Sequence, residues 1–118
     1  MILKIREIRT TTDINKECVV LEVVSKGNIK GHVLALDIFE HSRVTSNNMR
    51  HFVFPDQEVN IGDFVVVSTR YGHTSKQQNK DGSITYFYFW NLHYLICSRQ
   101  NTVILLQTLE TQKAKALV

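Results

Sequence analysis

The sequence predicts an all-β fold, built as a single β-sandwich, and three observations support this prediction. Short runs of β-branched and aromatic residues recur along the 118-residue chain, with glycine, asparagine and aspartate between them, which is typical of sandwiches and small barrels. No amphipathic pattern is long enough for a helix of more than about two turns. Residues 51–67, HFVFPDQEVNIGDFVVV, combine strand, turn and strand in one stretch.

The first part of the chain contains three predicted strands. Residues 2–8 alternate apolar and charged side chains, which is the period of a half-buried strand. Residues 18–24 are a β-branched run, and the following Ser-Lys-Gly-Asn at 25–28 suits a hairpin turn. Residues 32–39 form the third strand. The polar stretch 40–48 then predicts a loop.

The central segment has a chemical reason for each of its parts. Residues 52–54, Phe-Val-Phe, favour a pleated surface. Pro55 ends this strand because proline has no N–H to donate to a sheet ladder. Residues 56–58 are polar and predict a turn, and Gly62-Asp63 is a second turn signal before the apolar strand 64–67.

The C-terminal part begins with a predicted loop and ends with a predicted tail. Residues 71–83 hold glycine, asparagine and aspartate among charges, so we expect a mobile surface loop of about a dozen residues. Residues 84–90 and 102–109 are the last two strands. Residues 110–118 have weak helical character and predict a frayed tail. No Pro/Gly/Ser-rich linker divides the chain, so residues 1–118 are expected to be one domain.

The two most apolar strands supply the predicted core. We expect one packed core that includes Phe54, Val65, Val67, Leu105 and either Phe64 or Val66.

Composition and motif searches favour a non-enzymatic protein. The five histidines show no metal-ligand pairing, the acids are scattered, and no phosphate-binding glycine loop is present. Cys97 lies in an apolar run with no glycine turn to expose it as a nucleophile. We therefore expect no cofactor and no metal, with the histidines at the surface or half-buried. Cys18 and Cys97 are expected as buried thiols, and a disulfide between them is the alternative.

The order of motifs resembles the lamin tail domain family. The resemblance rests on VVLEVVSKGN at 19–28, IKGHVLAL at 29–36, HFVFPDQEVNIGDFVVV at 51–67, YFYFWN at 86–91 and NTVILLQ at 101–107. Two positions depart from the family pattern, since His32 stands where members often carry an aromatic residue and Gln100-Asn101 replaces a glycine-aspartate turn. The resemblance implies an immunoglobulin-like β-sandwich and a non-catalytic module. An oligonucleotide-binding barrel of five strands is the alternative fold.

The aromatic strand and the loop before it form the predicted interaction surface. Tyr86, Tyr88 and Trp90 share one face of a strand, and Phe87 and Phe89 share the other. One face should be core and the opposite face exposed, unless the fold covers both. The neighbouring loop adds a mostly cationic group, or alternatively is only solvated: Arg70, Tyr71, His73, Lys76 and Lys80.

A protein is the expected partner, because exposed aromatics anchor protein interfaces. Weak binding of single-stranded nucleic acid is the alternative, because cations meet phosphates and aromatics stack on bases. The formal charge of +3 is mild for a nucleic-acid-coating protein. No apolar stretch approaches a membrane span and no signal peptide is apparent, so we expect no membrane insertion and a soluble intracellular protein. The sequence leaves the oligomeric state open.

Overall fold

The computed structural model describes the backbone of residues 1–10, 12–37, 39–40, 43–44, 50–92, 102–107 and 110–115. Side chains are described for residues 1–10, 12–35 and 51–92. Every regular element within these residues is a β-strand, which confirms the all-β prediction. This part of the chain has no helix with the length and apolar composition needed to cross a membrane.

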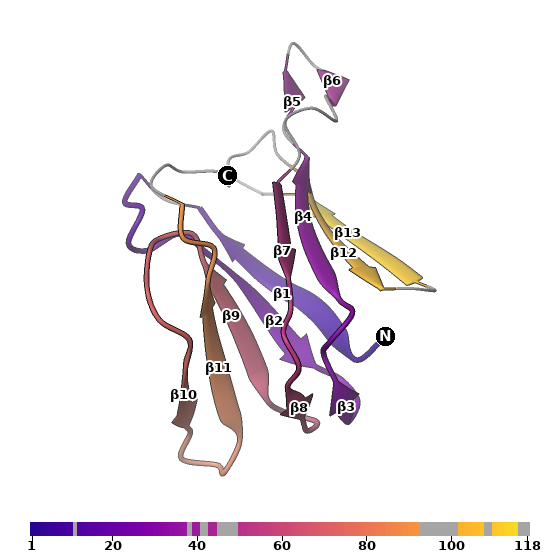
Figure 1. Ribbon diagram of the computed structural model, residues 1–118, viewed down its shortest axis with the longest axis vertical. Helices are drawn as coiled ribbons and strands as arrows, with labels where there is room; N and C mark the ends of the chain where they lie inside the picture. Colours follow the sequence, from indigo (N-terminus) through magenta and orange to yellow (C-terminus); the bar gives the residue numbers. More distant parts are fainter. Residues whose placement is uncertain are drawn as a thin grey trace.

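One layer of the structure is a five-stranded sheet (Figure 1). Its neighbours pair antiparallel, except that β9 and β11 run parallel. In spatial order the strands are β1 (Leu3–Arg9), β2 (Cys18–Val23), β9 (Phe64–Ser68), β11 (Ile84–Phe89) and β10 (Ser75–Gln78).

The second layer is a four-stranded antiparallel sheet. Its order is β13 (Glu110–Lys115), β12 (Thr102–Gln107), β4 (Val33–Asp37) and β7 (Arg50–Val53). Two short ladders complete the part of the chain that the structure describes, β3 (Gly27–Asn28) with β8 (Glu58–Val59) and β5 (Phe39–Glu40) with β6 (Arg43–Val44). This all-β arrangement in two main sheets is consistent with the predicted β-sandwich.

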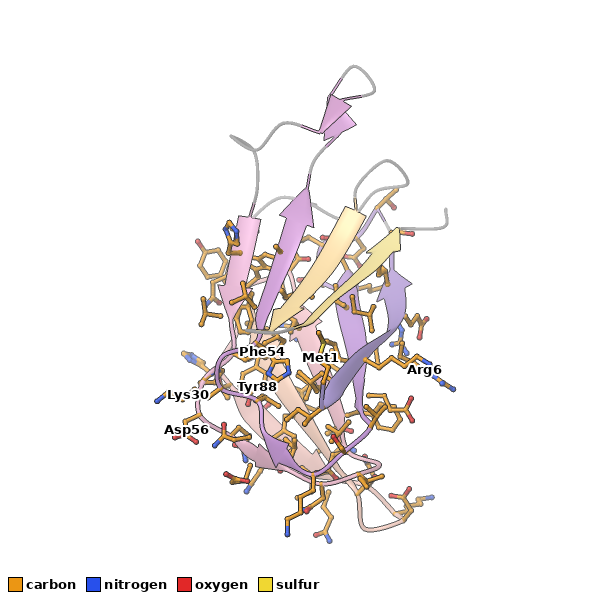
Figure 2. The ribbon with its side chains drawn as sticks, turned by 90° about the vertical axis from the view of Figure 1, so that its right-hand side faces the viewer. Met1, Arg6, Lys30, Phe54, Asp56 and Tyr88 are labelled. Carbon is orange, nitrogen blue, oxygen red and sulfur yellow. The ribbon has the colours of Figure 1, made fainter. Side chains whose placement is uncertain are left out.

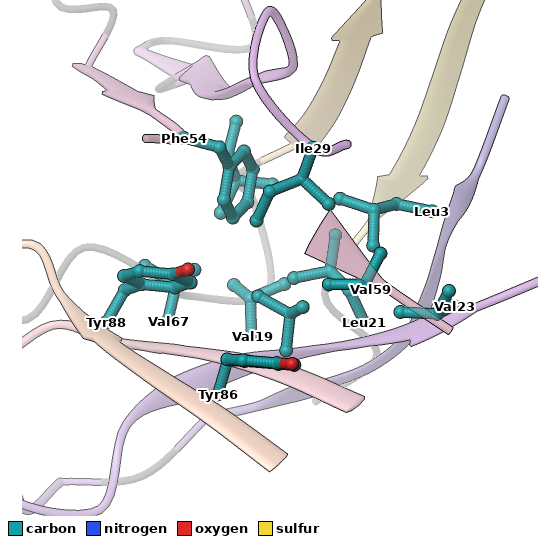
Figure 3. Packing of buried hydrophobic residues seen from close by; sticks show 12 residues of the cluster. Leu3, Val19, Leu21, Val23, Ile29, Phe54, Val59, Val67, Tyr86 and Tyr88 are labelled. Atoms are coloured by element: carbon teal, nitrogen blue, oxygen red, sulfur yellow. The ribbon is translucent and has the colours of Figure 1, made fainter. Parts of the chain in front are cut away.

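The core lies between the two sheets, as the close view in Figure 3 shows. Leu3, Leu21 and Val65 come from the five-stranded sheet and are fully buried. Phe54 follows β7 and is 1% exposed. Its ring makes an edge contact with the ring of Tyr88, with centroids 6.1 Å apart. Aromatic pairs in this geometry stabilise a core beyond the area that they bury.

The predicted core is confirmed for Phe54, Val65 and Val67 and is wrong for the choice of Phe64 or Val66. Phe54, Val65 and Val67 are buried at 1% exposure or less. Phe64 and Val66 are half-buried, because they point to the opposite face of β9. The side chain of Leu105 lies outside the described residues.

The turn predicted at Gly62-Asp63 joins three strands of the larger sheet. Gly62 has a φ of 91°, which favours glycine. The carboxylate of Asp63 is 3% exposed and accepts hydrogen bonds from the backbone N–H groups of Asn60 and Ile84, each at 2.9 Å. Its backbone carbonyl accepts from the N–H of Val23 at 2.9 Å. These bonds hold the ends of β2, β9 and β11 together.

Several predicted loops contain strands, so those predictions are wrong. Residues 75–78 form β10 within the predicted mobile loop 71–83. Residues 110–115 form β13 in place of a helical or frayed tail. The predicted turns and loop at 25–28, 56–58 and 40–48 contribute residues to β3, β8, β5 and β6. The common reason is composition: these segments carry no alternating apolar pattern, and their pairing comes from the strand beside them.

Replacing Phe54 with alanine should lower the free energy of unfolding by about 3–5 kcal/mol, because it opens a cavity in the core. Chemical denaturation monitored by circular dichroism measures this change. Val53→Ala is the matched control, since Val53 is 65% exposed, and it should change stability by less than about 0.5 kcal/mol. Equal effects of the two substitutions would contradict the placement of Phe54.

Candidate interaction site

The hairpin of β10 and β11 forms the frame of the candidate site. Its turn is closed by bonds from the N–H of Asn79 to the carbonyl of Ser83 at 2.7 Å and from the N–H of Gly82 to the carbonyl of Asn79 at 3.0 Å. Gly82 has a φ of 88°, as a type I turn with a glycine bulge requires. The carboxylate of Asp81 accepts bonds from the N–H and hydroxyl of Ser83, at 2.9 and 2.6 Å, which hold the pKa of Asp81 below its usual value.

The turn fixes which backbone groups of β10 face outward. Antiparallel strands alternate between hydrogen-bonded and non-hydrogen-bonded pairs. Asn79 bonds to Ser83, so the pairs of Gln77 with Thr85 and of Ser75 with Phe87 are the bonded ones. The N–H and C=O groups of Lys76 and Gln78 therefore point away from β11. Because β10 is the last strand of this sheet among the described residues, these groups form a sheet edge.

The connection from β9 to β10 crosses over the end of β11. Arg70 lies in this crossing, with its guanidinium 5.0 Å from the centre of the Phe89 ring. Gly72 packs directly on the same ring, since a Cβ atom there would lie 2.5 Å from ring atoms. The N–H of Gly72 also donates to the side-chain oxygen of Asn91 at 3.1 Å. The connection from β9 to β10 therefore covers the ring of Phe89.

A buried carboxylate anchors the start of this crossing. Glu17 is fully buried, and the hydroxyl of Thr69 donates to its carboxylate at 2.5 Å. The N–H of Thr69 donates to the carbonyl of Glu17 at 3.2 Å. The carbonyl of Thr69 accepts from the N–H of Leu92 at 2.8 Å. These hydrogen bonds therefore hold the chain on both sides at Thr69, directly after β9 ends.

The aromatic strand turns its tyrosines inward, which corrects part of the predicted surface. Tyr86 is 6% exposed and Tyr88 is 3% exposed, so neither ring offers a broad exposed face. Trp90 is half-buried and lies 6.1 Å from the ring of Phe52. Phe87 and Phe89 are half-buried on the outer face of the sheet.

The outer face of the larger sheet carries an apolar row that sequence reasoning missed. Val20, Val66 and Phe87 are direct neighbours across β2, β9 and β11. Val20 lies on the outer face, opposite to the face that the second sheet covers, and is still only 8% exposed. The signal for this row was the continuous apolar character of residues 18–21 and 64–67, which is typical of strands with two apolar faces.

The cationic residues of the predicted surface are spread along the hairpin. Tyr71 is 61% exposed, and His73, Lys76 and Lys80 are also exposed. Lys80 lies in the turn, at the opposite end of β10 from Arg70 and His73. The structure therefore does not gather these charges into one patch.

Lys76 is the cation that the structure brings to the tyrosines. It pairs directly with Tyr86 across the hairpin, so both side chains lie on the same face. A pocket of about 230 Å³ lies there, lined by Gln57, Thr74, Ser75, Lys76, Tyr86 and Tyr88. Tyr88 lies beside Phe54, and Figure 2 shows both side chains.

Both phenols of the pocket keep their protons at neutral pH. Burial raises the pKa of Tyr86, and the nearby Asp63 carboxylate adds to the rise. Burial raises the pKa of Tyr88 to about 12, with a smaller contribution from Tyr86. The hydroxyl of Tyr86 donates to the carbonyl of Glu58 at 3.4 Å.

The described residues hold no group of three His, Cys, Asp or Glu side chains placed as metal ligands would be. His32 is fully buried, with Nδ1 3.0 Å from the carbonyl oxygen of Ile29, so the prediction of surface or half-buried histidines is wrong for this residue. Cys18 is a buried free thiol whose pKa is raised by burial, against the lowering effect of Arg9. Cys97 lies outside the described residues.

An alkaline titration should separate Tyr88 from an exposed phenol. Phenolate absorbance should show a component with a midpoint near pH 12, and Tyr88→Phe should remove it. Because the folded pKa lies above the unfolded value of about 10, the buried phenol stabilises the fold fully below pH 10. This contribution should be lost as pH rises from about 10 to about 12. A midpoint near 10 for every tyrosine would contradict the burial of Tyr88.

Gly72→Ala should destabilise the protein by about 1–3 kcal/mol, because the added methyl group overlaps the Phe89 ring. Denaturation of the single and double variants with Phe89→Ala measures the coupling. The cost of Gly72→Ala should largely disappear once the ring is removed. Additive effects of the two substitutions would show that the crossing does not pack on Phe89.

Comparison with known proteins places this frame in a family. A family model, TP_1001_2nd, described as a protein second domain, matches residues 2–85. The match runs from β1 into the start of β11 and so includes the whole of β10. Its description names no activity and no ligand. No curated protein matches this chain. Because the model covers more than half of the 118 residues, the chain belongs to the TP_1001_2nd family.

Proposed function

We propose that this protein is a non-enzymatic interaction module that binds an extended segment of a protein partner along the edge of β10. The observation that carries this proposal is the open ladder of β10. All four of its residues are exposed, and β11 is its only partner strand among the described residues. An unpaired edge of this kind accepts an added strand through backbone hydrogen bonds.

The two edges of the larger sheet differ in how well they suit this role. β1 has a register shift between Ile5 and Glu7, and such bulges disrupt the pairing of an edge. β10 keeps a continuous register with β11 over residues 75–78. Figure 1 places β10 at one margin of the molecule. The second sheet ends at its edge strand β7. These features favour β10 as the docking edge.

The resemblance to lamin tail domains supports the same proposal, because it implies a non-catalytic module. Tyr71 is 61% exposed in the connection that leads to β10 and supplies an aromatic contact for a partner. Single-stranded nucleic acid is the weaker candidate partner. Base stacking was expected on Tyr86 and Tyr88, and their burial removes that surface.

Selection of short random peptides displayed on phage tests the edge. The wild-type protein should enrich peptides rich in β-branched residues, since these favour an added strand. Gln78→Pro should weaken their binding by at least about tenfold. The substitution removes an outward N–H and no bond to β11, so the fold should be retained.

Gln78→Ala is the matched control for this experiment. It removes the same side chain and keeps the backbone N–H, so peptide binding should stay within about twofold. Circular dichroism of both variants checks that the fold is intact. If peptides bind the wild type and Gln78→Pro equally, or if no peptide is enriched, the β10 edge is not the binding site.

A further inference from the structure

The pocket beside Lys76 offers a contact that backbone pairing alone does not use. We infer that it binds a carboxylate side chain, aspartate or glutamate, of the extended segment that adds to β10. This inference rests on the proposed function and specifies the chemistry of the partner.

The lining of the pocket has the chemistry of an anion site. Among the lining residues that the structure describes, Lys76 supplies the only charge and none is acidic. Tyr88, Thr74 and Ser75 contribute hydroxyl groups, and Gln57 contributes an amide. Hydrogen bonds between an ammonium group and a carboxylate are about twice as strong as neutral ones. The pocket therefore favours an anion over a neutral or cationic group.

The size of the pocket suits a side chain. Its volume of about 230 Å³ is several times the share of one water molecule in the liquid, about 30 Å³. A carboxymethyl or carboxyethyl group therefore fits with room for solvent.

The register of β10 delivers a partner side chain to this place. The backbone groups of Lys76 point outward, so a residue of an added strand would pair with Lys76 directly. Directly paired residues share one face of a sheet. Lys76 shares its face with Tyr86, so the partner residue opposite Lys76 projects its side chain on the pocket side. One residue of β10 thus offers both the backbone contacts and the charge.

The experiment compares each selected peptide with a copy whose acidic residues are replaced by their amides. We expect an acidic residue at a fixed position in the enriched peptides, and a loss of at least about tenfold in affinity when it becomes an amide. Lys76→Gln should cause a similar loss for the acidic peptide and little loss for the amide copy. Lys80→Gln is the matched control, because Lys80 is exposed in the turn of the same hairpin, and it should change affinity by less than about twofold.

Charge reversal gives a positive test. Selection repeated on Lys76→Glu should enrich lysine or arginine at the position where the wild type enriches an acid. Peptides that need the edge, as judged by Gln78→Pro, but show neither an acidic position nor dependence on Lys76 would overturn the carboxylate site and leave the edge function standing. Absence of any edge-dependent peptide would overturn the proposed function itself, and this inference with it.

Discussion

The parallel pairing of β9 with β11 is the constraint on which the candidate site depends. A chain that leaves β9 cannot make a tight hairpin into a parallel neighbour. Here it crosses the end of β11, runs back as β10, and enters β11 through the turn at residues 79–83. This route places β10 at the margin of the sheet and lays the crossing over Phe89. The edge, the pocket and the covered ring all follow from one connection.

The orientation of β11 follows from what each face can offer its aromatic rings. The inner face borders the pocket, where a phenol can bury its ring and still reach a polar group, as Tyr86 does with the carbonyl of Glu58. None of the described sheets covers the outer face, but Arg70 and Gly72 fold over Phe89. A phenylalanine there needs no hydrogen-bond partner. Alternation alone could not distinguish these two arrangements, because both faces of the strand are aromatic.

The sequence predicted the fold wherever local chemistry decides the structure. The apolar strands, the glycine turn before Asp63 and the buried side chains of Phe54, Val65 and Val67 were all apparent from residue type. β10 was not, because Ser75–Gln78 has no apolar residue and its strand form comes from pairing with β11. The pairing of Lys76 with Tyr86 was also hidden, since it depends on the position of β10 beside β11. Long-range pairing therefore determined most of the site, and local propensity determined most of the core.

The polar character of β10 has two consequences that act together. A polar edge strand with a lysine resists non-specific pairing, which is how natural sheets protect their edges. The same lysine lines a pocket whose described residues carry hydroxyl groups and no acidic group, so under the proposed function its charge is available to a partner. An added strand without a carboxylate at that position would leave the ammonium group partly desolvated and unpaired, which disfavours it. Under the proposed function, the edge is therefore protected against most extended segments and open to those that carry the matching charge, and selectivity and protection have the same physical origin.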